Sequence, residues 1–294
     1  MNKKEPWFVD KYFVVTGGSS GIGLAITKEL LLNGANVIIA SYNSLEFENA
    51  QKELEMIPNL EDRVKFYQCD ITKNEDRSKL KEELEKKNFD ITGIINNAGI
   101  TTYGPFFKTA SKDIERLMNV NFVGSIMFIR DLFPLCLNSE CVDDTNMKYI
   151  VFTSSTSGLV ALPYIGGYSG TKRGVEFFLK SMSYELPKNV NILIIRPGTV
   201  HTKLYENAKQ CDGTDISDLV ETTEEMKIMI TADKVAKPLI KAIIKKKGGL
   251  IYPNKKTRIF YGMMTLPLLG KKMVKYAAKK MEKGFEPHLK VSST

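Results

Sequence analysis

Tyr168 and Lys172 are two side chains whose types and spacing could do chemistry. They lie four residues apart, and on a helix this spacing places them on the same face. A phenol with its ordinary pKa of about 10 exchanges protons poorly at neutral pH, but a neighbouring ammonium favours the phenolate and lowers that pKa. The pair could therefore exchange a proton with an oxygen of a bound molecule. The alternative is a tyrosine and a lysine on a solvent-facing helix surface.

The segment from Thr16 to Gly23 has the glycine spacing of a phosphate-binding turn. It reads Thr-Gly-Gly-Ser-Ser-Gly-Ile-Gly and follows the strand-like run Tyr12–Thr16. Gly17 permits a tight turn, whereas Gly21 and Gly23 let the backbone approach a pyrophosphate and let the next helix pack closely. The phosphates would lie at the N-terminus of that helix. The position after a strand predicts a dinucleotide site; a tight turn without a ligand is the alternative.

Further motifs, in order along the chain, give it a resemblance to the short-chain dehydrogenase/reductase family. Asn96-Asn97-Ala98-Gly99 ends the fourth predicted strand, and Asn121 begins Asn121-Phe122-Val123-Gly124. Ser155 precedes Tyr168 by 13 positions, Tyr168 and Lys172 form a YxxxK motif, and Pro197-Gly198 follows the sixth predicted strand. The resemblance covers roughly residues 10–250, and the motifs stand at family-like spacing.

This resemblance implies an oxidoreductase that interconverts a carbonyl and a secondary alcohol with a nicotinamide cofactor. Tyr168 would be the general acid or base, Ser155 would hydrogen-bond the substrate oxygen, and Lys172 would also hold the nicotinamide ribose. Asn121 would hold a water that links Lys172 to solvent. The expected cofactor-binding residues are Gly17, Ser19, Ser20, Gly21, Ile22, Gly23, Ser41, Tyr42, Asp70, Ile71, Asn97, Ala98, Gly99, Tyr168, Lys172, Pro197, Gly198, Val200 and Thr202.

The end of the second predicted strand bears on the choice of cofactor. It reads Ala40-Ser41-Tyr42-Asn43 and lacks the acid that would bind the adenosine ribose hydroxyls and repel a 2′-phosphate. NADP(H) is therefore favoured over NAD(H). Many NADP-dependent relatives carry arginine near this point, whereas this chain has Ser20 and Tyr42. Asp70 matches the family residue that contacts the adenine.

Several segments look most like the 3-ketodihydrosphingosine reductase branch. They are Ile114–Asn121, Ile150–Ser155, Glu221–Thr223 and Asp233–Lys237. This favours a long-chain 3-keto lipid as substrate. Retinol, steroid and 3-oxoacyl reductases share much of the pattern, so a 3-oxoacyl thioester, a steroid and a retinoid stay open. A non-enzymatic alternative is a nucleotide-binding pseudo-enzyme or scaffold, although such relatives usually lose the tyrosine or the lysine.

Short apolar runs alternate with amphipathic segments of helical length along the chain. This alternation predicts one doubly wound α/β Rossmann domain, with a seven-stranded, mainly parallel sheet covered by helices on both faces. The domain would span residues 1–254, and a C-terminal extension residues 255–294. A polar segment, Thr199–Thr231, is expected to be a substrate lid or a plain surface excursion. The expected strands are Tyr12–Thr16, Asn36–Ala40, Val64–Cys69, Ile91–Asn96, Lys148–Ser154, Val190–Arg196 and Leu250–Tyr252; the expected helices are Ile22–Asn33, Leu45–Ile57, Asn74–Lys87, Asp113–Asn138, Tyr168–Leu186 and Ala232–Lys247.

Composition limits the remaining function classes. The 294 residues are 43% apolar and 26% charged, which is typical of a globular protein. Two histidines and four cysteines without CxxC spacing argue against a metal site and a disulfide framework. We expect reduced thiols and a cytoplasmic location, with the cytosolic face of a membrane as a further option. Neither a signal peptide nor a spanning stretch of about 20 apolar residues is expected.

The positive charge is concentrated near the C-terminus. Residues 233–294 hold 16 Lys and Arg against 3 Asp and Glu, a net +13, so the first 232 residues are net −5 of a total of +8. Nucleic-acid binding is therefore not expected, because the tail has no recognisable binding module.

An apolar run, Arg258–Gly270, precedes Lys271–Lys283, in which Met273, Val274, Tyr276, Ala277 and Met281 stand near helical spacing. This extension is expected to cover the substrate cleft or to contact a membrane surface. A homo-oligomer is expected by resemblance.

Overall fold

A computed structural model describes residues 8–137, 146–202, 204, 209–210 and 229–289 of the chain. Seven parallel strands form its central sheet in the order β3-β2-β1-β4-β6-β7-β9. The chain runs outward from β1 to β3 and then returns to place β4 on the other side of β1, so the strand order reverses there. The strands are β1 Tyr12–Thr16, β2 Asn36–Ser41, β3 Val64–Gln68, β4 Ile91–Asn96, β6 Lys148–Thr153, β7 Val190–Ile195 and β9 Gly249–Ile251.

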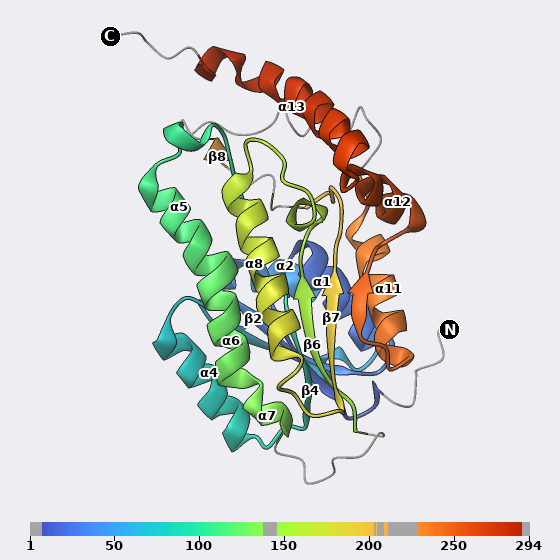
Figure 1. Cartoon of the computed structure of the whole chain (residues 1–294). Helices are drawn as coiled ribbons and strands as arrows, with labels where there is room; N and C mark the ends of the chain where they lie inside the picture. Colours follow the sequence, from blue (N-terminus) through green and yellow to red (C-terminus); the bar gives the residue numbers. More distant parts are fainter. Residues whose placement is uncertain (1–7, 138–145, 203, 205–208, 211–228, 290–294) are drawn as a thin grey trace.

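Helices cover both faces of the sheet because alternate strand residues point to opposite faces. Phe13 and Val15 pack with α1 Gly21–Leu32, α2 Phe47–Leu54 and α11 Ala232–Ile244. Val14 between them packs on the other face, which α4, α6 and α8 cover. Figure 1 shows α4, α6 and α8 side by side on that face. The bounds of these helices and of the others between β2 and β7 are α3 Leu60–Arg63, α4 Asn74–Lys86, α5 Ser111–Met118, α6 Ser125–Leu132, α7 Pro134–Leu137 and α8 Gly166–Met182.

The predicted doubly wound fold is confirmed, and each predicted strand end lies within one residue of the observed end. One helix differs in kind. The segment expected as a single helix from Asp113 to Asn138 contains a π-helical stretch, Asn119–Gly124, between α5 and α6. A Cβ at Gly124 would lie 2.9 Å from the Asn119 carbonyl oxygen and 3.1 Å from Ile71. Close packing at Gly124 therefore accompanies the wider turn, which hydrophobic periodicity does not reveal.

One helical run passes a test of length and composition for a membrane span, although the sequence predicts no spanning helix. The described residues contain one such helical run, Ser111–Leu137, with a mean hydropathy of 1.5 over its most apolar window. Half of that window is buried inside the fold, and α6 within it packs on the sheet. The run therefore has the apolar character of a core helix.

A short second sheet joins two connections in which the sequence predicts no strand. Thr102–Tyr103 (β5), after β4, pairs in parallel with Lys209–Gln210 (β8), after β7. On either side of β8 in the chain, Val200 forms a bridge with Ile230, and the Ile230 N–H donates to the Thr199 carbonyl. The two ends of the expected lid, Thr199–Thr231, are thus tied together, whereas residues 211–228 of it lie outside the described residues, as does the Glu221–Thr223 segment.

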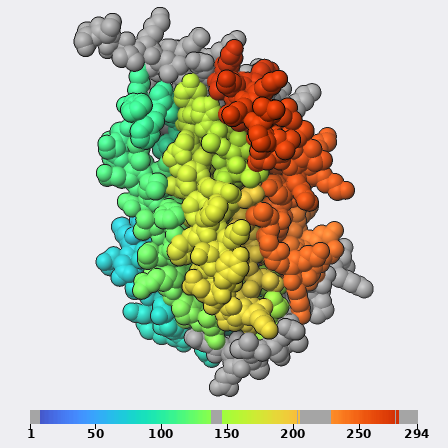
Figure 2. All heavy atoms as spheres, viewed as in Figure 1, coloured from blue at the N-terminus to red at the C-terminus, as the bar shows by residue number. Residues whose placement is uncertain are grey.

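The C-terminal extension is helical, as predicted, and consists of α12 Lys255–Met264 and α13 Pro267–Leu289. Figure 1 shows both helices at the end of the molecule toward which β6 and β7 point, and Figure 2 shows α13 on the molecular surface. A Cβ at Gly270 would lie 2.0 Å from the Met264 carbonyl oxygen, so the two helices meet closely there. The boundary at residue 255 as a division between units stays a prediction. The side chains of Ala277 and Met281 lie outside the described part.

Candidate active site

One pocket opens at the carboxyl ends of β1, β4, β6 and β7. Four segments form its walls: the glycine turn after β1, the turn after β4, the end of β6 with the start of α8, and the chain after β7. This is the crevice where ligands bind in open α/β sheets. The lining residues are Gly17, Ser20, Gly21, Ile22, Asn97, Ala98, Gly99, Ile100, Thr101, Thr153, Ser154, Ser155, Tyr168, Lys172, Pro197, Gly198, Val200, Thr202 and Leu204.

Most residues predicted from the sequence line this pocket, but some lie outside it. Those outside are Ser19, Gly23, Ser41, Tyr42, Asp70, Ile71 and Asn121. Sequence reasoning missed five lining residues: Ile100, Thr101, Thr153, Ser154 and Leu204. Thr153 and Ser154 could have been found, because they immediately precede Ser155 at the carboxyl end of a predicted strand.

The glycine turn has the geometry that a bound pyrophosphate needs. Gly17 and Gly21 have φ angles of +62° and +53°, which favour glycine. A Cβ at Gly23 would lie 2.1 Å from the Gly17 carbonyl oxygen, so the turn closes only with glycine there. Helix α1 begins at Gly21 with no acidic residue in its first turn and no side-chain cap from Ser20. These residues fit a dinucleotide, because the N-terminus of α1 offers backbone N–H groups to phosphates.

Thr16 fastens the glycine turn to the turn after β4. Its Oγ1 accepts hydrogen bonds from the N–H groups of Asn97 at 2.9 Å and Ala98 at 3.0 Å. The Asn97 side-chain amide donates to the Thr16 carbonyl at 3.2 Å. The two walls that flank the reversal of strand order are therefore held in fixed register.

Lys172 is buried beneath the pocket, one helical turn after Tyr168. Its Nζ donates to the Thr153 carbonyl at 2.8 Å and lies 5.7 Å from the centre of the Tyr168 ring. Burial lowers the pKa of Lys172 to about 8, and the Glu176 carboxylate partly opposes that change. A Cβ at Gly99 would lie 3.3 Å from this Nζ. Gly99 therefore leaves room above the ammonium, on the pocket side.

Ser155 and Tyr168 face the same pocket from different elements. Ser155 follows β6, and its Oγ accepts from the Ser157 N–H at 3.2 Å and lies 2.9 Å from the Ser157 hydroxyl oxygen. Tyr168 lies in the first turn of α8, which begins at Gly166. The chain thus places a hydroxyl, a phenol and an ammonium around one space, and these groups together can transfer a proton to a carbonyl oxygen.

Asn121 lies in the π-helical stretch and does not line the pocket. Its side-chain oxygen accepts from the Ile100 N–H and its amide donates to the Ile100 carbonyl, both at 2.8 Å. A Cβ at Gly99 would lie 3.3 Å from the Asn121 oxygen as well as from Lys172 Nζ. Asn121 therefore holds the Gly99–Ile100 turn next to Lys172; its expected role in holding a water stays a prediction.

Glu176 is a buried carboxylate that sequence reasoning missed. It lies one turn beyond Lys172 on α8 and accepts from the Ser154 hydroxyl at 2.6 Å and from Arg196 Nε at 2.8 Å. The Arg196 guanidinium also donates to the Tyr252 hydroxyl at 2.9 Å, just after β9. One carboxylate thus joins α8 to the ends of β6 and β7. The YxxxK motif followed by an acid four residues later was the available signal.

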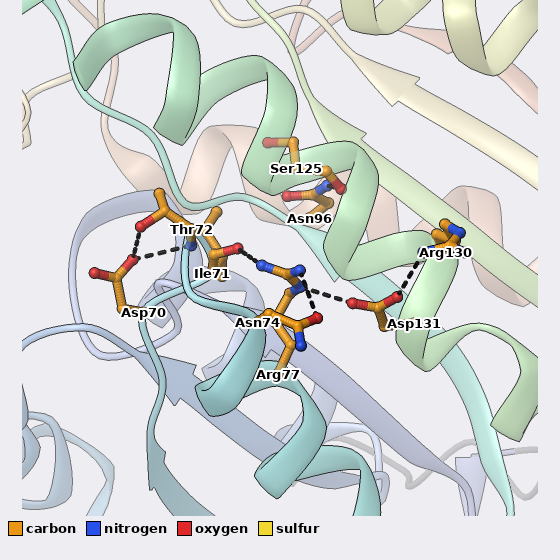
Figure 3. Close-up of polar contacts among 9 residues, drawn as sticks. All are labelled: Asp70, Ile71, Thr72, Asn74, Arg77, Asn96, Ser125, Arg130 and Asp131. Atoms are coloured by element: carbon orange, nitrogen blue, oxygen red, sulfur yellow. Dashed lines mark hydrogen bonds and ion pairs between the residues drawn. The ribbon is translucent and has the colours of Figure 1, made fainter. Parts of the chain in front are cut away.

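Asp70 and Ile71, expected near the adenine, lie in the turn between β3 and α4 (Figure 3). The Asp70 carboxylate accepts from the Thr72 N–H at 2.9 Å and from its hydroxyl at 2.7 Å. Arg77 donates to the Ile71 carbonyl at 2.8 Å and to Asp131 at 2.7 Å. This nearly buried ion pair ties the turn to α6. Figure 3 also shows Asn96 beside Ser125, whose carbonyl accepts from the Asn96 amide at 2.7 Å.

Ser19 and Ser41 meet on the other side of the glycine turn, at the end of β2. Their hydroxyl oxygens lie 3.0 Å apart, and Ser19 Oγ lies 3.0 Å from a carboxylate oxygen of Glu46. Glu46 was not among the predicted residues, because it follows the strand end by five positions. Within the described residues, no group of three or more His, Cys, Asp and Glu side chains could hold a metal ion.

The family model of the short chain dehydrogenases matches residues 11–212. The chain belongs to this family, which confirms the resemblance drawn from its motifs. The match does not distinguish the 3-ketodihydrosphingosine reductase branch.

Relatives from animals and bacteria extend over most of the chain. A dehydrogenase/reductase SDR family protein 7-like from Drosophila melanogaster is 26% identical over 85% of this chain and 75% of its own length. The dehydrogenase/reductase SDR family member 7B of Mus musculus is 26% identical over 81% and 72%. The putative oxidoreductase SadH of Mycobacterium tuberculosis is 25% identical over 83% and 86%.

Solved structures share the fold at lower identity. A short-chain dehydrogenase/reductase from Burkholderia phymatum in complex with NAD has a TM-score of 0.73 and 20% identity, over 87% of this chain and 93% of that one. A short-chain dehydrogenase from Sphingobium yanoikuyae in complex with NADPH has a TM-score of 0.67 and 18% identity, over 97% and 98%. These structures support the architecture and include both forms of the cofactor.

Proposed function

We propose that this chain interconverts a carbonyl and a secondary alcohol, with Tyr168 as the group that gives or takes the proton. The observation that carries the proposal is that Ser155, Tyr168 and Lys172 border the same pocket as the glycine turn. A bound nicotinamide cofactor would supply or accept the hydride. The glycine turn and the N-terminus of α1 would hold its phosphates, and Lys172 its nearer ribose.

The remaining chemistry belongs to the side chains. During reduction, the Ser155 hydroxyl donates a hydrogen bond to the carbonyl oxygen and orients it. The Tyr168 phenol then donates its proton to that oxygen as negative charge develops there. The Lys172 ammonium, 5.7 Å from the centre of the Tyr168 ring, stabilises the phenolate that remains. During oxidation the phenolate accepts the proton of the alcohol.

Replacing Tyr168 by phenylalanine tests this assignment. The Tyr168→Phe variant keeps the ring but loses the proton, so we expect kcat to fall by about 10²-fold or more while NAD(P)H still binds. Tyr184→Phe is a matched control, because Tyr184 is 83% exposed. Reductase turnover in Tyr168→Phe equal to that of the unchanged protein would contradict the mechanism.

We propose a lipid-like ketone as substrate, with 3-ketodihydrosphingosine as the first candidate. The proposal is supported by the branch-like segments Ile114–Asn121 and Ile150–Ser155 and by the apolar extension beside the pocket. A 3-oxoacyl thioester, a steroid and a retinoid are the alternatives. Oxidation of NADPH and NADH by the purified protein, followed with each of these compounds in turn, separates them. Turnover with steroids alone would contradict the long-chain lipid proposal.

We also propose that residues 40–43, at the end of β2, by themselves favour NADP(H), because they contain no acid that would repel the 2′-phosphate. This is the basis of the predicted preference for NADP(H). Ser41→Asp would place a carboxylate near that phosphate and should weaken NADPH binding. If titration showed NADH to be the tighter ligand of the unchanged protein, the preference for NADP(H) would be wrong.

A homo-oligomer is proposed through the outer faces of α5, α6 and α8. Phe177 and Phe178 on α8 are 57% and 43% exposed, and Met118 at the end of α5 is 41% exposed. A second copy would remove these apolar side chains from water, and members of the family pair their catalytic-helix faces in this way. Sedimentation velocity of Phe177→Ser against the unchanged protein tests it; a monomer in both contradicts it.

We propose that the protein is cytoplasmic and that its C-terminal extension contacts the surface of a membrane. Helix α12 packs on the pocket wall, since a Cβ at Gly198 would lie 3.7 Å from the Tyr261 ring. Its Ile259 and Phe260 are 60% and 46% exposed, and the exposed Lys271 and Lys272 follow on α13. A lipid-like substrate could then enter the pocket from the membrane surface.

A further inference from the structure

The side of the glycine turn away from the pocket carries a polar cluster formed by Ser19, Ser41 and Glu46. The Ser19 hydroxyl oxygen lies 3.0 Å from that of Ser41 and 3.0 Å from Glu46 Oε2. Ser19 and Ser41 are each 4% exposed, whereas Glu46 is half-buried at the edge of the cluster. One carboxylate therefore lies against the turn that is expected to hold a dinucleotide.

The local chain brings this carboxylate back toward β2. After β2 ends at Ser41, the Asn43 side chain accepts a hydrogen bond from the Leu45 N–H at 3.1 Å. This bond caps the 3-10 turn Ser44–Glu46, which leads directly into α2. The reversal returns Glu46 to the glycine turn, although it stands five residues beyond the strand.

The cluster lies where the second ribose of a dinucleotide would bind. In doubly wound folds the ribose farther from the nicotinamide lies at the end of the second strand, where an acid contacts its 2′-hydroxyl. Ser155, Tyr168 and Lys172 lie on the pocket side of the turn. A dinucleotide with its nicotinamide there and its phosphates over Gly21 would extend its other ribose toward Ser19, Ser41 and Glu46.

Charge decides which ribose fits this cluster. Neither residues 17–23 nor residues 41–46 contain a lysine or an arginine. A 2′-hydroxyl can donate a hydrogen bond to the Glu46 carboxylate, whereas a 2′-phosphate would bring like charge against it without a cation from either segment. The Glu46 carboxylate would therefore stabilise bound NAD(H) and destabilise bound NADP(H).

We propose that Glu46 is a specificity-determining residue that selects against the 2′-phosphate, in place of an acid at the end of β2. The inference rests on the proposed function, because it requires the glycine turn to hold a nicotinamide dinucleotide. It opposes the NADP(H) preference that residues 40–43 predict, and the balance between NADPH and NADH depends on the carboxylate of Glu46.

Fluorescence titration of NADPH and NADH tests the inference in the full-length protein and in Glu46→Gln. We expect the ratio of the NADPH to the NADH dissociation constant to fall by about tenfold or more, equivalent to about 1.4 kcal/mol. Glu48→Gln is the matched control, because Glu48 is exposed in the next turn and should leave the ratio unchanged. Glu46→Arg should lower the ratio further than Glu46→Gln.

The possible outcomes separate the inference from the proposed function. Both nucleotides binding to Glu46→Gln with the ratio of the unchanged protein would overturn the role of Glu46 and leave the proposed function intact. A similar fall of the ratio in Glu48→Gln would also overturn it, because the effect would then be a general one of surface charge. Failure of the unchanged protein to bind either nucleotide would overturn the proposed function and the inference with it.

Discussion

Lys172 shows how the protein sets the ionisation of a single residue. Its side chain is buried and has the Thr153 carbonyl as hydrogen-bond partner. Burial disfavours the charged form and lowers the pKa of this lysine to about 8, although Glu176 favours the charge. Lys172 can therefore lose its proton near physiological pH, whereas an exposed lysine cannot.

The activity should therefore depend on pH through Lys172. The ammonium is the form that stabilises the Tyr168 phenolate, so we expect kcat/KM for ketone reduction to fall as the pH rises through about 8. Initial rates at saturating nucleotide, measured between about pH 6 and pH 10, give this pH dependence of kcat/KM. In the Lys172→Arg variant the guanidinium stays charged across this range, so the fall of kcat/KM should begin at higher pH. A rate in the unchanged protein that stays constant across that range contradicts the prediction.

At the scale of elements, α8 carries the catalytic side chains and also fastens itself to the sheet. Tyr168, Lys172 and Glu176 stand at successive turns of this helix. Glu176 binds Ser154 beyond β6 and Arg196 beyond β7. Because Ser155 and Pro197 are the next residues along the chain, this buried ion pair positions two walls of the pocket relative to the helix.

Glu176→Gln should destabilise the protein and disturb the pocket. Removing the carboxylate leaves the Arg196 guanidinium buried without its counter-ion, so we expect a loss of about 3–5 kcal/mol in the free energy of unfolding. The fall of kcat/KM with pH should also begin at lower pH, because Glu176 raises the pKa of Lys172. Urea denaturation and pH profiles measure the two effects. The exposed Glu82→Gln on α4 is the control, expected to stay within about 0.5 kcal/mol; a Glu176→Gln value in that same range would contradict the prediction.

The glycine turn is the second element whose geometry can be tested. A Cβ at Gly23 would lie 2.1 Å from the Gly17 carbonyl oxygen, so Gly23→Ala must displace the turn. We expect it to weaken NAD(P)H binding by at least about tenfold, as judged by the same fluorescence titration. Gly262→Ala in α12 is the control, because its Cβ would meet no atom within 4 Å. Equal affinities in the two variants would show that the turn does not hold the nucleotide.

At the scale of the whole molecule, the C-terminal helices add a charged and apolar surface beside the pocket. Leu266, Leu268 and Leu269 are 51%, 81% and 43% exposed around the junction of α12 and α13. The exposed lysines Lys271, Lys272 and Lys275 follow within the first turns of α13. An apolar edge next to clustered lysines is the pattern of a segment that lies on an anionic membrane.

We therefore expect weak, salt-sensitive binding to anionic vesicles and none to neutral ones. Each lysine near an anionic surface contributes about 1 kcal/mol, so changing Lys271, Lys272 and Lys275 to glutamate should abolish flotation with the vesicles. Truncation before Arg258 should do the same. The same charge change at Lys79, Lys86 and Lys87, on and just after α4, is the control and should leave flotation intact. Equal flotation of both triple variants, or no flotation of the active unchanged protein, would leave the extension as a cover of the pocket.

Much of this fold could be predicted from the sequence because its signals are local. A short apolar run rich in β-branched residues, such as Asn36–Ser41, predicts a buried strand, and this strand is buried along its whole length. The glycines of the turn and the Tyr168–Lys172 spacing likewise indicate their backbone and helix face over a few residues. The resemblance of these motifs to a family then identifies the class of enzyme from the sequence by itself.

Only the tertiary structure decided which distant groups act together. The π-helical stretch around Asn121 is fastened by bonds to Ile100, 21 residues away. Glu176 meets Arg196 across 20 residues, and Glu46 meets Ser19 across 27. The sequence around a carboxylate does not predict its distant partner, because that pairing depends on how the helices and strands pack. For the same reason the strand end at Ser41 looks free of acid in the sequence, whereas the folded chain returns Glu46 to that place.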